Sequence, residues 1–140
     1  MLCNAGNQFG ARPCRTLRSS LSGKPLEIKG DGTPVRSYLY GADLSAWLWT
    51  LLLHPKASGA YNVGSDEAHS ILEIAEMVSA HSPEQQRITV ARPPTPGQAP
   101  QRYVPDITRA RRELGLGVWT RLEHAVERTL AFYQPVQTSA

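Results

Sequence analysis

Apolar residues recur at helical spacing in several segments of this 140-residue chain. In the clearest segment they fall at positions i, i+3, i+4, i+7 and i+8, which predicts a helix with one broad apolar face. We expect Asp43 to cap its N-terminus and Pro55 to close it, because a carboxylate accepts first-turn N–H groups and proline cannot continue a helix. The apolar positions are Leu44, Trp47, Leu48, Leu51 and Leu52.

Two further segments combine helical periodicity with the spacing of a capping box, in which Ser or Thr precedes Glu by three residues. Ser70 and Glu73 predict the start of one helix, and Thr120 and Glu123 predict the start of the last one. The expected core stripe of the first is Ile71, Ile74, Ala75 and Val78. That of the second is Leu122, Ala125, Val126, Thr129, Leu130 and Tyr133.

Short extended runs alternate with these helices. The runs 25–28 and 35–40 flank the tight turn Gly30-Asp31-Gly32, which predicts a hairpin. Further extended runs are expected at 59–65, 87–91 and 103–105, with the irregular proline-rich loop "RPPTPGQAPQ" between the last two. Asp106 is expected to cap a short helix that runs through Leu114 and breaks at the glycines of 115–117. This order of elements predicts an α/β fold class.

The composition excludes several classes of protein and does not by itself point to a function. The net charge is +3, and twelve of the fifteen basic residues are Arg, but no polybasic tract suggests nucleic-acid binding. Cys3 and Cys14 lack a CxxC partner, and the four histidines lack metal-ligand spacing, so neither a disulfide framework nor a metal site is expected. The longest apolar run, 46–53, is too short to span a membrane, and a cytoplasmic location is the expectation.

The motif search leaves two arginines at strand–loop junctions. No GxGxxG, GxxxxGK or GxSxG motif occurs. Arg36 begins one predicted strand and Arg102 precedes another, so the pair could clamp a diphosphate through charge-assisted hydrogen bonds. The alternative is that each forms a local salt bridge, with Asp31 or Asp106, and spacing alone does not choose between the two interpretations.

Four blocks of sequence resemble the C-terminal portion of the NAD-dependent nucleotide-sugar epimerases and dehydratases of the extended short-chain dehydrogenase/reductase family. They occur in the order found in that family and together cover about residues 20–133. The blocks are "GKPLEIKGDGTPVRSYLYGADLSAWLWTLL" (23–52), "GAYNVGSDEAHSILEIAEMV" (59–78), "RYVPDITRARRELGL" (102–116) and "LEHAVERTLAFY" (122–133).

The resemblance implies that the chain is a C-terminal substrate-binding lobe joined to the edge helix and strand of a Rossmann-type domain, with most of the Rossmann sheet lying upstream. Residues 21–134 would form this unit, between an irregular segment 1–20 and a disordered tail 135–140. Arg36 and Arg102 would contact the diphosphate of a nucleotide sugar, and Tyr103 and Asp106 would bind substrate or brace the site. The apolar face of the edge helix, Leu44, Trp47 and Leu51, would face the absent sheet.

The same resemblance implies NAD as the cofactor of an intact family member involved in carbohydrate biosynthesis. This chain has neither the glycine-rich loop nor any tyrosine with lysine four residues later. We therefore expect no catalytic or cofactor-binding residues here, no cofactor bound by this chain alone and no activity without a partner. That partner would be a separate Rossmann chain or a second copy.

The chain is expected to be a family fragment that contributes nucleotide-sugar binding. The alternative is a stand-alone, non-catalytic binding or regulatory module. Epimerase and dehydratase remain equally open.

Overall fold

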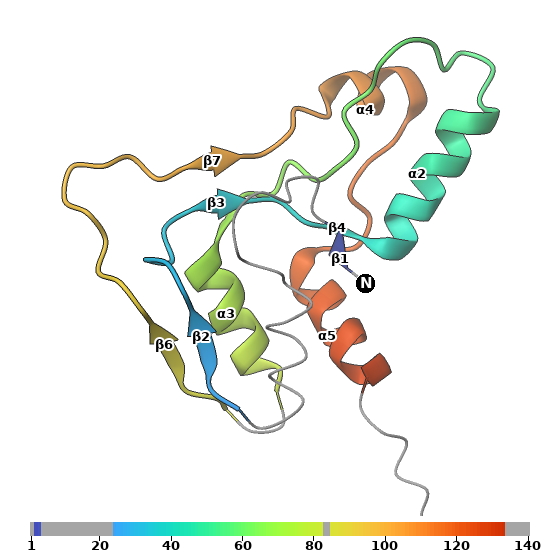
Figure 1. Ribbon diagram of the computed structural model, residues 1–140. Helices are drawn as coiled ribbons and strands as arrows, with labels where there is room; N and C mark the ends of the chain where they lie inside the picture. The colour runs from blue at the N-terminus through green and yellow to red at the C-terminus, as the bar shows by residue number, and fades with distance from the viewer. Residues whose placement is uncertain (1, 4–23, 83–84, 134–140) are drawn as a thin grey trace, which may run out of the picture.

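The computed structural model describes residues 2–3, 24–82 and 85–133, and its arrangement is shown in Figure 1. The mixture of helices and short parallel and antiparallel strands confirms the predicted α/β class. Of the N-terminal segment 1–20 only β1 is described, and the tail 135–140 lies outside the described residues. The helices are α2 (Gly41–Leu53), α3 (Ile71–Ala80), α4 (Thr108–Leu114) and α5 (Leu122–Tyr133). The strands are β1 (Leu2–Cys3), β2 (Leu26–Ile28), β3 (Val35–Arg36), β4 (Leu39–Tyr40), β5 (His69–Ser70), β6 (Ile88–Val90) and β7 (Arg102–Tyr103).

The strands form three small sheets rather than one. Strand β1 pairs with β4 in antiparallel fashion, and β2 pairs with β6 in parallel fashion. The third sheet has the order β5-β3-β7, with β5 antiparallel and β7 parallel to β3. The extended run predicted at 87–91 is present as the short strand β6, whereas β7 covers 102–103 and shares only Tyr103 with the run predicted at 103–105.

The predicted hairpin is wrong, because β2 and β3 belong to different sheets. The turn between them docks instead onto the first turn of α3. There the N–H of Leu72 donates to the carbonyl of Gly32 at 3.1 Å, and the N–H of Ile71 donates to Pro34 at 3.0 Å. Gly32 has a φ of 78°, a left-handed conformation that glycine adopts without strain. The first N–H groups of α3 thus bond the carbonyls of this turn, which in a hairpin would face a neighbouring strand.

A first hydrophobic cluster lies between α3, α5 and β2. The capping box of α3 is confirmed, because Ser70 accepts the N–H of Glu73 while the Glu73 carboxylate accepts the N–H of Ser70. The predicted stripe of α5 is buried except for Tyr133, which is 55% exposed, so that prediction was wrong for the last position. The cluster consists of Leu26, Tyr38, Ile74, Val78, Leu122, Ala125, Val126 and Leu130.

A second cluster lies between α2 and α4. Trp47 of α2 is fully buried there, and its indole Nε1 donates to the carbonyl of Gly117 at 2.9 Å. Leu44 and Leu51 pack against the same cluster. The expectation that Leu44, Trp47 and Leu51 face an absent sheet is therefore wrong, because this chain supplies their partners. The buried members are Leu39, Trp47, Ile107, Ala110 and Leu116.

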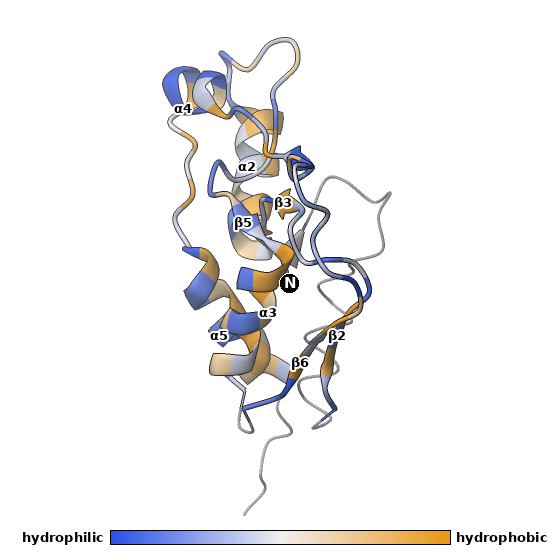
Figure 2. Cartoon of the chain, turned by 90° about the vertical axis from the view of Figure 1, so that its left-hand side faces the viewer, coloured by the Kyte–Doolittle hydropathy of each residue, from blue (hydrophilic) through white to orange (hydrophobic). Residues whose placement is uncertain are grey.

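The other side of α2 is apolar and exposed. Four of its side chains are between 53% and 72% exposed: Leu48, Trp49, Leu52 and Leu53. Hydropathy colouring shows the apolar character of α2 at the upper end of the molecule in Figure 2. Leu48 and Leu52, which the sequence placed in one stripe with Trp47, thus belong to the exposed side.

Asp43 does not cap α2, contrary to the prediction. The helix begins at Gly41, and the buried carboxylate of Asp43 accepts the N–H groups of Trp119 and Thr120 at 3.1 and 2.8 Å. It also accepts the Thr120 hydroxyl at 2.9 Å. Because that hydroxyl points to Asp43 and α5 begins only at Leu122, Thr120 does not form the predicted capping box. Asp43 instead ties α2 to the chain that enters α5.

The run 59–65 is not a strand in the structure. Strands need neighbouring strands to bond their backbone, and here side chains take that role: Arg109 bonds the carbonyls of Ser58 and Ala60. The short helix α4 does follow Asp106 and ends before Gly115, as predicted. Within the described part of the chain, no helix is long and apolar enough to cross a membrane.

Candidate functional site

Arg36 lies on β3, the central strand of the three-stranded sheet, and Figures 1 and 2 show this strand beside the start of α3. Its side chain is half-buried, and Nη1 donates to the carbonyls of Val35 at 2.8 Å and Gln101 at 3.1 Å. These two bonds hold the guanidinium at the edge of β3 and β7. Its Nε and Nη2 form no hydrogen bond with a described residue, which leaves them available to an anion.

The local salt bridges considered for the two arginines are not formed among the described residues. Asp31 accepts the N–H and the hydroxyl of Thr33, at 3.1 and 3.0 Å, inside its own turn. Asp106 accepts the N–H of Thr108 at 2.8 Å. Both carboxylates are thus used locally, and Arg36 has no acidic partner in the described part of the chain.

Strand β7 brings Arg102 and Tyr103 beside β3. In the parallel register, Val35 is opposite Arg102 and Arg36 is opposite Tyr103. Successive side chains of a strand point to opposite faces of the sheet, so Arg36 and Tyr103 share one face and Arg102 lies with Val35 on the other. Arg102 and Tyr103 are both exposed. The structure thus brings the two arginines to neighbouring strands but does not aim them in the same direction.

Asp106 lies where β7 leads into α4, and its observed contacts are structural. Its bonds with Thr108, chiefly the side-chain bond and then the backbone bond, lower the pKa of the carboxyl below its ordinary value. The Asn62 side-chain amide donates to the Asp106 carbonyl at 2.9 Å. A Cβ at Gly64 would lie 2.7 Å from the Pro105 ring, so glycine is needed for the loop to pack this closely. These contacts fix the path of the chain from β7 to α4.

His69 is a neighbour of Arg36 that the sequence did not identify as part of the site. It lies on β5 directly opposite Arg36, so β5, β3 and β7 present His69, Arg36 and Tyr103 as one row on one face. Its side chain is 25% exposed, and Nε2 is buried without a hydrogen-bond partner among the described residues, 3.9 Å from Glu67 Oε2. The signal in the sequence was its place immediately before the Ser70 capping box, which fixes it on the strand entering α3.

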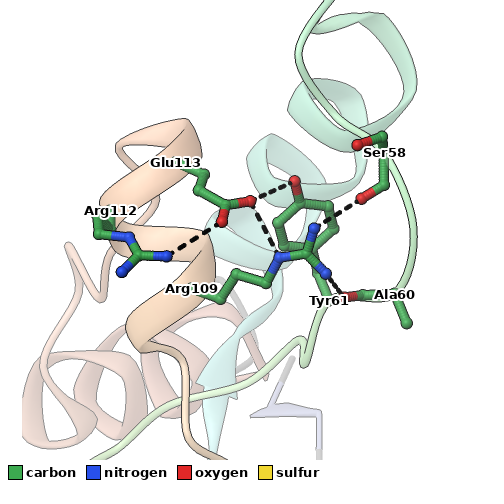
Figure 3. Close-up of polar contacts among 6 residues, drawn as sticks. All are labelled: Ser58, Ala60, Tyr61, Arg109, Arg112 and Glu113. Carbon is green, nitrogen blue, oxygen red and sulfur yellow. Dashed lines mark hydrogen bonds and ion pairs between the residues drawn. The ribbon is translucent and has the colours of Figure 1, made fainter.

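Arg109 anchors α4 to the loop after α2, as Figure 3 shows. Its Nε donates to Glu113 at 3.0 Å, and its two terminal nitrogens donate to the carbonyls of Ala60 at 2.9 Å and Ser58 at 3.0 Å. The guanidinium lies 4.4 Å from the centre of the Tyr61 ring, a cation–π contact. Tyr61 in turn donates its hydroxyl to Glu113 at 3.0 Å.

The ionisation of this cluster follows from its contacts. The hydrogen bond from Arg109, followed by that from Tyr61, lowers the pKa of Glu113, and the bond to Glu113 raises the pKa of Arg109. Arg112 also contacts Glu113, at 3.3 Å, and Arg111 pairs with Asp66 at 2.9 Å. The three arginines of α4 thus have carboxylate partners, unlike Arg36, and serve as a scaffold.

Other parts of the molecule add little chemistry. A shallow hollow of about 410 Å³ lies between α3 and β6 and contains none of the four predicted site residues. No group of His, Cys, Asp and Glu within the described ranges could hold a metal ion. The row on β5, β3 and β7 is therefore the strongest candidate site.

Comparisons with known proteins point to one family. Residues 6–64 match the model of the NAD dependent epimerase/dehydratase family, a match that starts inside the segment 1–20. A zebrafish (Danio rerio) UDP-glucuronic acid decarboxylase 1 is 30% identical over 117 residues, which are 84% of this chain and 27% of that protein. A dTDP-glucose 4,6-dehydratase of Neisseria gonorrhoeae is 27% identical over an alignment that covers 95% of this chain and 43% of the relative.

Solved structures agree with these relatives. The UDP-glucuronic acid 4-epimerase of Bacillus cereus, determined with UDP-glucuronic acid and NAD, superposes with a TM-score of 0.73 and 27% identity. The superposition covers 87% of this chain and 39% of the epimerase. The chain thus spans less than half the length of each of these relatives, while most of its own length is shared with them.

Proposed function

Because the chain belongs to the NAD-dependent epimerase/dehydratase family, we propose that it contributes the binding of a nucleoside-diphosphate sugar to an enzyme of this family. The relatives named above act on or bind UDP- and dTDP-linked sugars. The ligand class proposed for this chain is accordingly a pyrimidine nucleoside-diphosphate sugar.

Arg36 is the observation that carries this proposal. A half-buried guanidinium held by two carbonyls, with no acidic partner in the described chain, is a pre-positioned cation. Diphosphate oxygens are its natural ligands, since arginine binds them through charge-assisted and often bidentate hydrogen bonds. Tyr103 lies on the same face and would contact the ligand beside Arg36. Arg102 lies on the opposite face and would reach the ligand around the edge strand β7, and Asp106 would brace the segment from β7 to α4.

The two turns considered next, both in the described part of the chain, do not fit the pyrophosphate of NAD. The turn at Gly32 leads into the strand β3, and the glycine at Gly41 follows β4 without a loop, so neither gives the glycine-rich turn before a helix that binds a pyrophosphate. We assign NAD to the remainder of the family's fold and derive no step through it. This chain's proposed part is to bind and orient the sugar nucleotide, which lowers the entropic cost of reaction.

The exposed side of α2 favours a role within a larger assembly over a stand-alone module. Leu48, Trp49, Leu52 and Leu53 are apolar and largely exposed, and contiguous exposed apolar surface commonly marks an interaction site. An NAD-binding Rossmann chain is the partner that this function requires, with a second copy of the chain as the alternative. A stand-alone binding module would bind the same ligand without any such partner.

The test is ligand-dependent stabilisation of the chain. Thermal unfolding with UDP-glucose, UDP-glucuronic acid or dTDP-glucose should raise Tm, by an amount equivalent to about 2.7 kcal/mol at a hundredfold excess over Kd. Arg36→Ala should abolish the shift, while Arg128→Ala, which removes an equal charge from the exposed face of α5, should retain it. The absence of a shift with all three ligands would overturn the proposal.

A further inference from the structure

The residue opposite Arg36 on β5 has a buried polar atom that no described group satisfies. His69 Nε2 is shielded from solvent and lacks a hydrogen-bond partner in the described chain. Leaving a buried polar atom unpaired is unfavourable, so each case in a folded protein calls for a reason. The nearest acidic atom, Glu67 Oε2, is 3.9 Å away, a distance that suits an ion pair but not a hydrogen bond.

We propose that His69 is a second, pH-controlled cation of the anion-binding row, which in its protonated form pairs with Glu67 and strengthens diphosphate binding at Arg36. This inference rests on the function proposed above and deepens it, because it adds a regulating residue to the same site.

The register supports a direct electrostatic influence. His69 and Arg36 are directly opposed in an antiparallel pair, and such residues have their Cβ atoms about 4.5–5.5 Å apart on one face. A charge on the imidazole therefore adds to the field of Arg36 without touching the ligand. A neutral imidazole and a protonated one differ by one unit of positive charge, and histidine is the residue type that proteins most often use for a change of charge near neutral pH.

The charged and titratable groups around His69 are few. On its own side are Glu67, at 3.9 Å, and Glu73. The Glu73 carboxylate is held by the backbone and side chain of Ser70, which lower its pKa, with a smaller contribution from His69 itself. Across the sheet lie Arg36 on β3 and, one strand further, Arg102 and Tyr103 on β7. Asp66, one residue before Glu67, is already paired with Arg111.

The N-terminus of α3 does not offer a competing explanation for anion binding. Its first three N–H groups are used: Ile71 donates to Pro34, Leu72 donates to Gly32, and Glu73 donates to the Ser70 hydroxyl. A ligand near β3 therefore meets side-chain cations rather than free backbone donors. Two positive charges on one face, His69 and Arg36, suit the two charges of a diphosphate.

The test is the pH dependence of UDP-glucose binding, measured by calorimetry on the whole chain at about pH 5.5 and 7.5. The diphosphate charge of this ligand is constant over this range, so a change in affinity reports on the protein. The wild type should bind about threefold to tenfold more tightly at the lower pH, as expected for one added unit charge near the site. His69→Gln should bind equally at both values, and Glu67→Gln should flatten the dependence while the imidazole is retained.

His124→Asn is the control, since His124 is exposed on α5 and should leave the wild-type dependence unchanged. If His69→Gln keeps the wild-type dependence while Arg36→Ala loses binding, the inference is overturned and the proposed function stands. If the wild type binds at neither pH, both are overturned. If His69→Gln unfolds, Glu67→Gln decides alone: a wild-type pH dependence in that variant overturns the inference.

Discussion

Helices α2 and α5 are both rich in apolar residues, yet they use them differently. Along α5 the buried positions recur with helical period, and Leu122, Val126 and Leu130 are each at most 3% exposed. In α2 only Trp47 is buried to that degree, while Trp49, two residues later, is 63% exposed. The stripe of α5 has its partners, α3 and β2, within the chain. The apolar residues of α2 surround the helix, and the chain covers only one side of them.

The difference separates the apolar residues that stabilise this chain from those that are free to contact another molecule. Burial of apolar surface contributes about 25 cal/mol per Å² only where water is excluded. The α5 stripe and Trp47 therefore contribute to folding, whereas the exposed side of α2 contributes almost nothing until something covers it. This chain covers 27% and 43% of the lengths of two of its relatives, so both contain further residues outside the shared part.

The two tryptophans of α2 provide the largest expected contrast. Trp47→Ala should lower the free energy of unfolding by about 3–5 kcal/mol, because it empties the centre of the second cluster and removes the bond to Gly117. Trp49→Ala should change it by at most about 1 kcal/mol, as for other exposed positions. Urea unfolding followed by far-UV circular dichroism measures both. Equal losses would contradict the assignment of the two faces.

A leucine pair extends the contrast from α2 to α5. Leu130→Ala removes a side chain that is 2% exposed and should destabilise the fold by about 2–5 kcal/mol. Leu52→Ala on α2, where the leucine is 72% exposed, should change stability by no more than about 0.5 kcal/mol. The variants are chemically identical, so the measured difference isolates burial. A large loss for Leu52→Ala would show that α2 is already covered in solution, for example by a second copy.

Asp43 joins the two helices, and its removal should have an intermediate effect. Asp43→Ala leaves the N–H groups of Trp119 and Thr120 without their acceptor. The expected cost is about 1–3 kcal/mol, the usual penalty for unsatisfied buried donors. Asp66→Ala, which breaks an exposed pair with Arg111, should cost at most about 1 kcal/mol. If both variants lose the same stability, Asp43 acts as an ordinary surface charge.

Local signals in the sequence predicted where the helices lie better than they predicted what each helix contacts. The capping box at Ser70 and the stripe of α5 could be found because each consists of residues that recur three or four positions apart within one short segment. The role of Asp43 could not be found in this way, because its partners are 76 and 77 residues away. The hairpin was wrong for a related reason: the turn at Gly32 bonds α3, a contact between distant segments.

The candidate site shows the same division. Arg36 could be singled out from its place after the turn, and the register of β3 with β7 brings Arg102 and Tyr103 beside it. Their division between two faces depends on strand register, which no single segment encodes. His69 was overlooked because only the pairing of β5 with β3 places it opposite Arg36.

The smallest expected effect concerns the acid stability of the region around α2 and α4. The bonds from Arg109 and Tyr61 lower the pKa of Glu113 in the folded state below its ordinary value of 4.5. A depressed folded-state pKa gives stability that is fully present above pH 4.5 and is lost as the pH falls through the folded value.

Glu113→Gln should therefore lower Tm slightly at pH 7. Its difference from wild type should shrink as the pH is lowered below 4.5, because wild-type Glu113 is then protonated first in the unfolded state and, at lower pH, in the folded state as well. Glu127→Gln, at an exposed position of α5, should match wild type throughout. A Glu113→Gln difference that stayed constant down to pH 3 would show that the contribution of Glu113 is packing rather than charge.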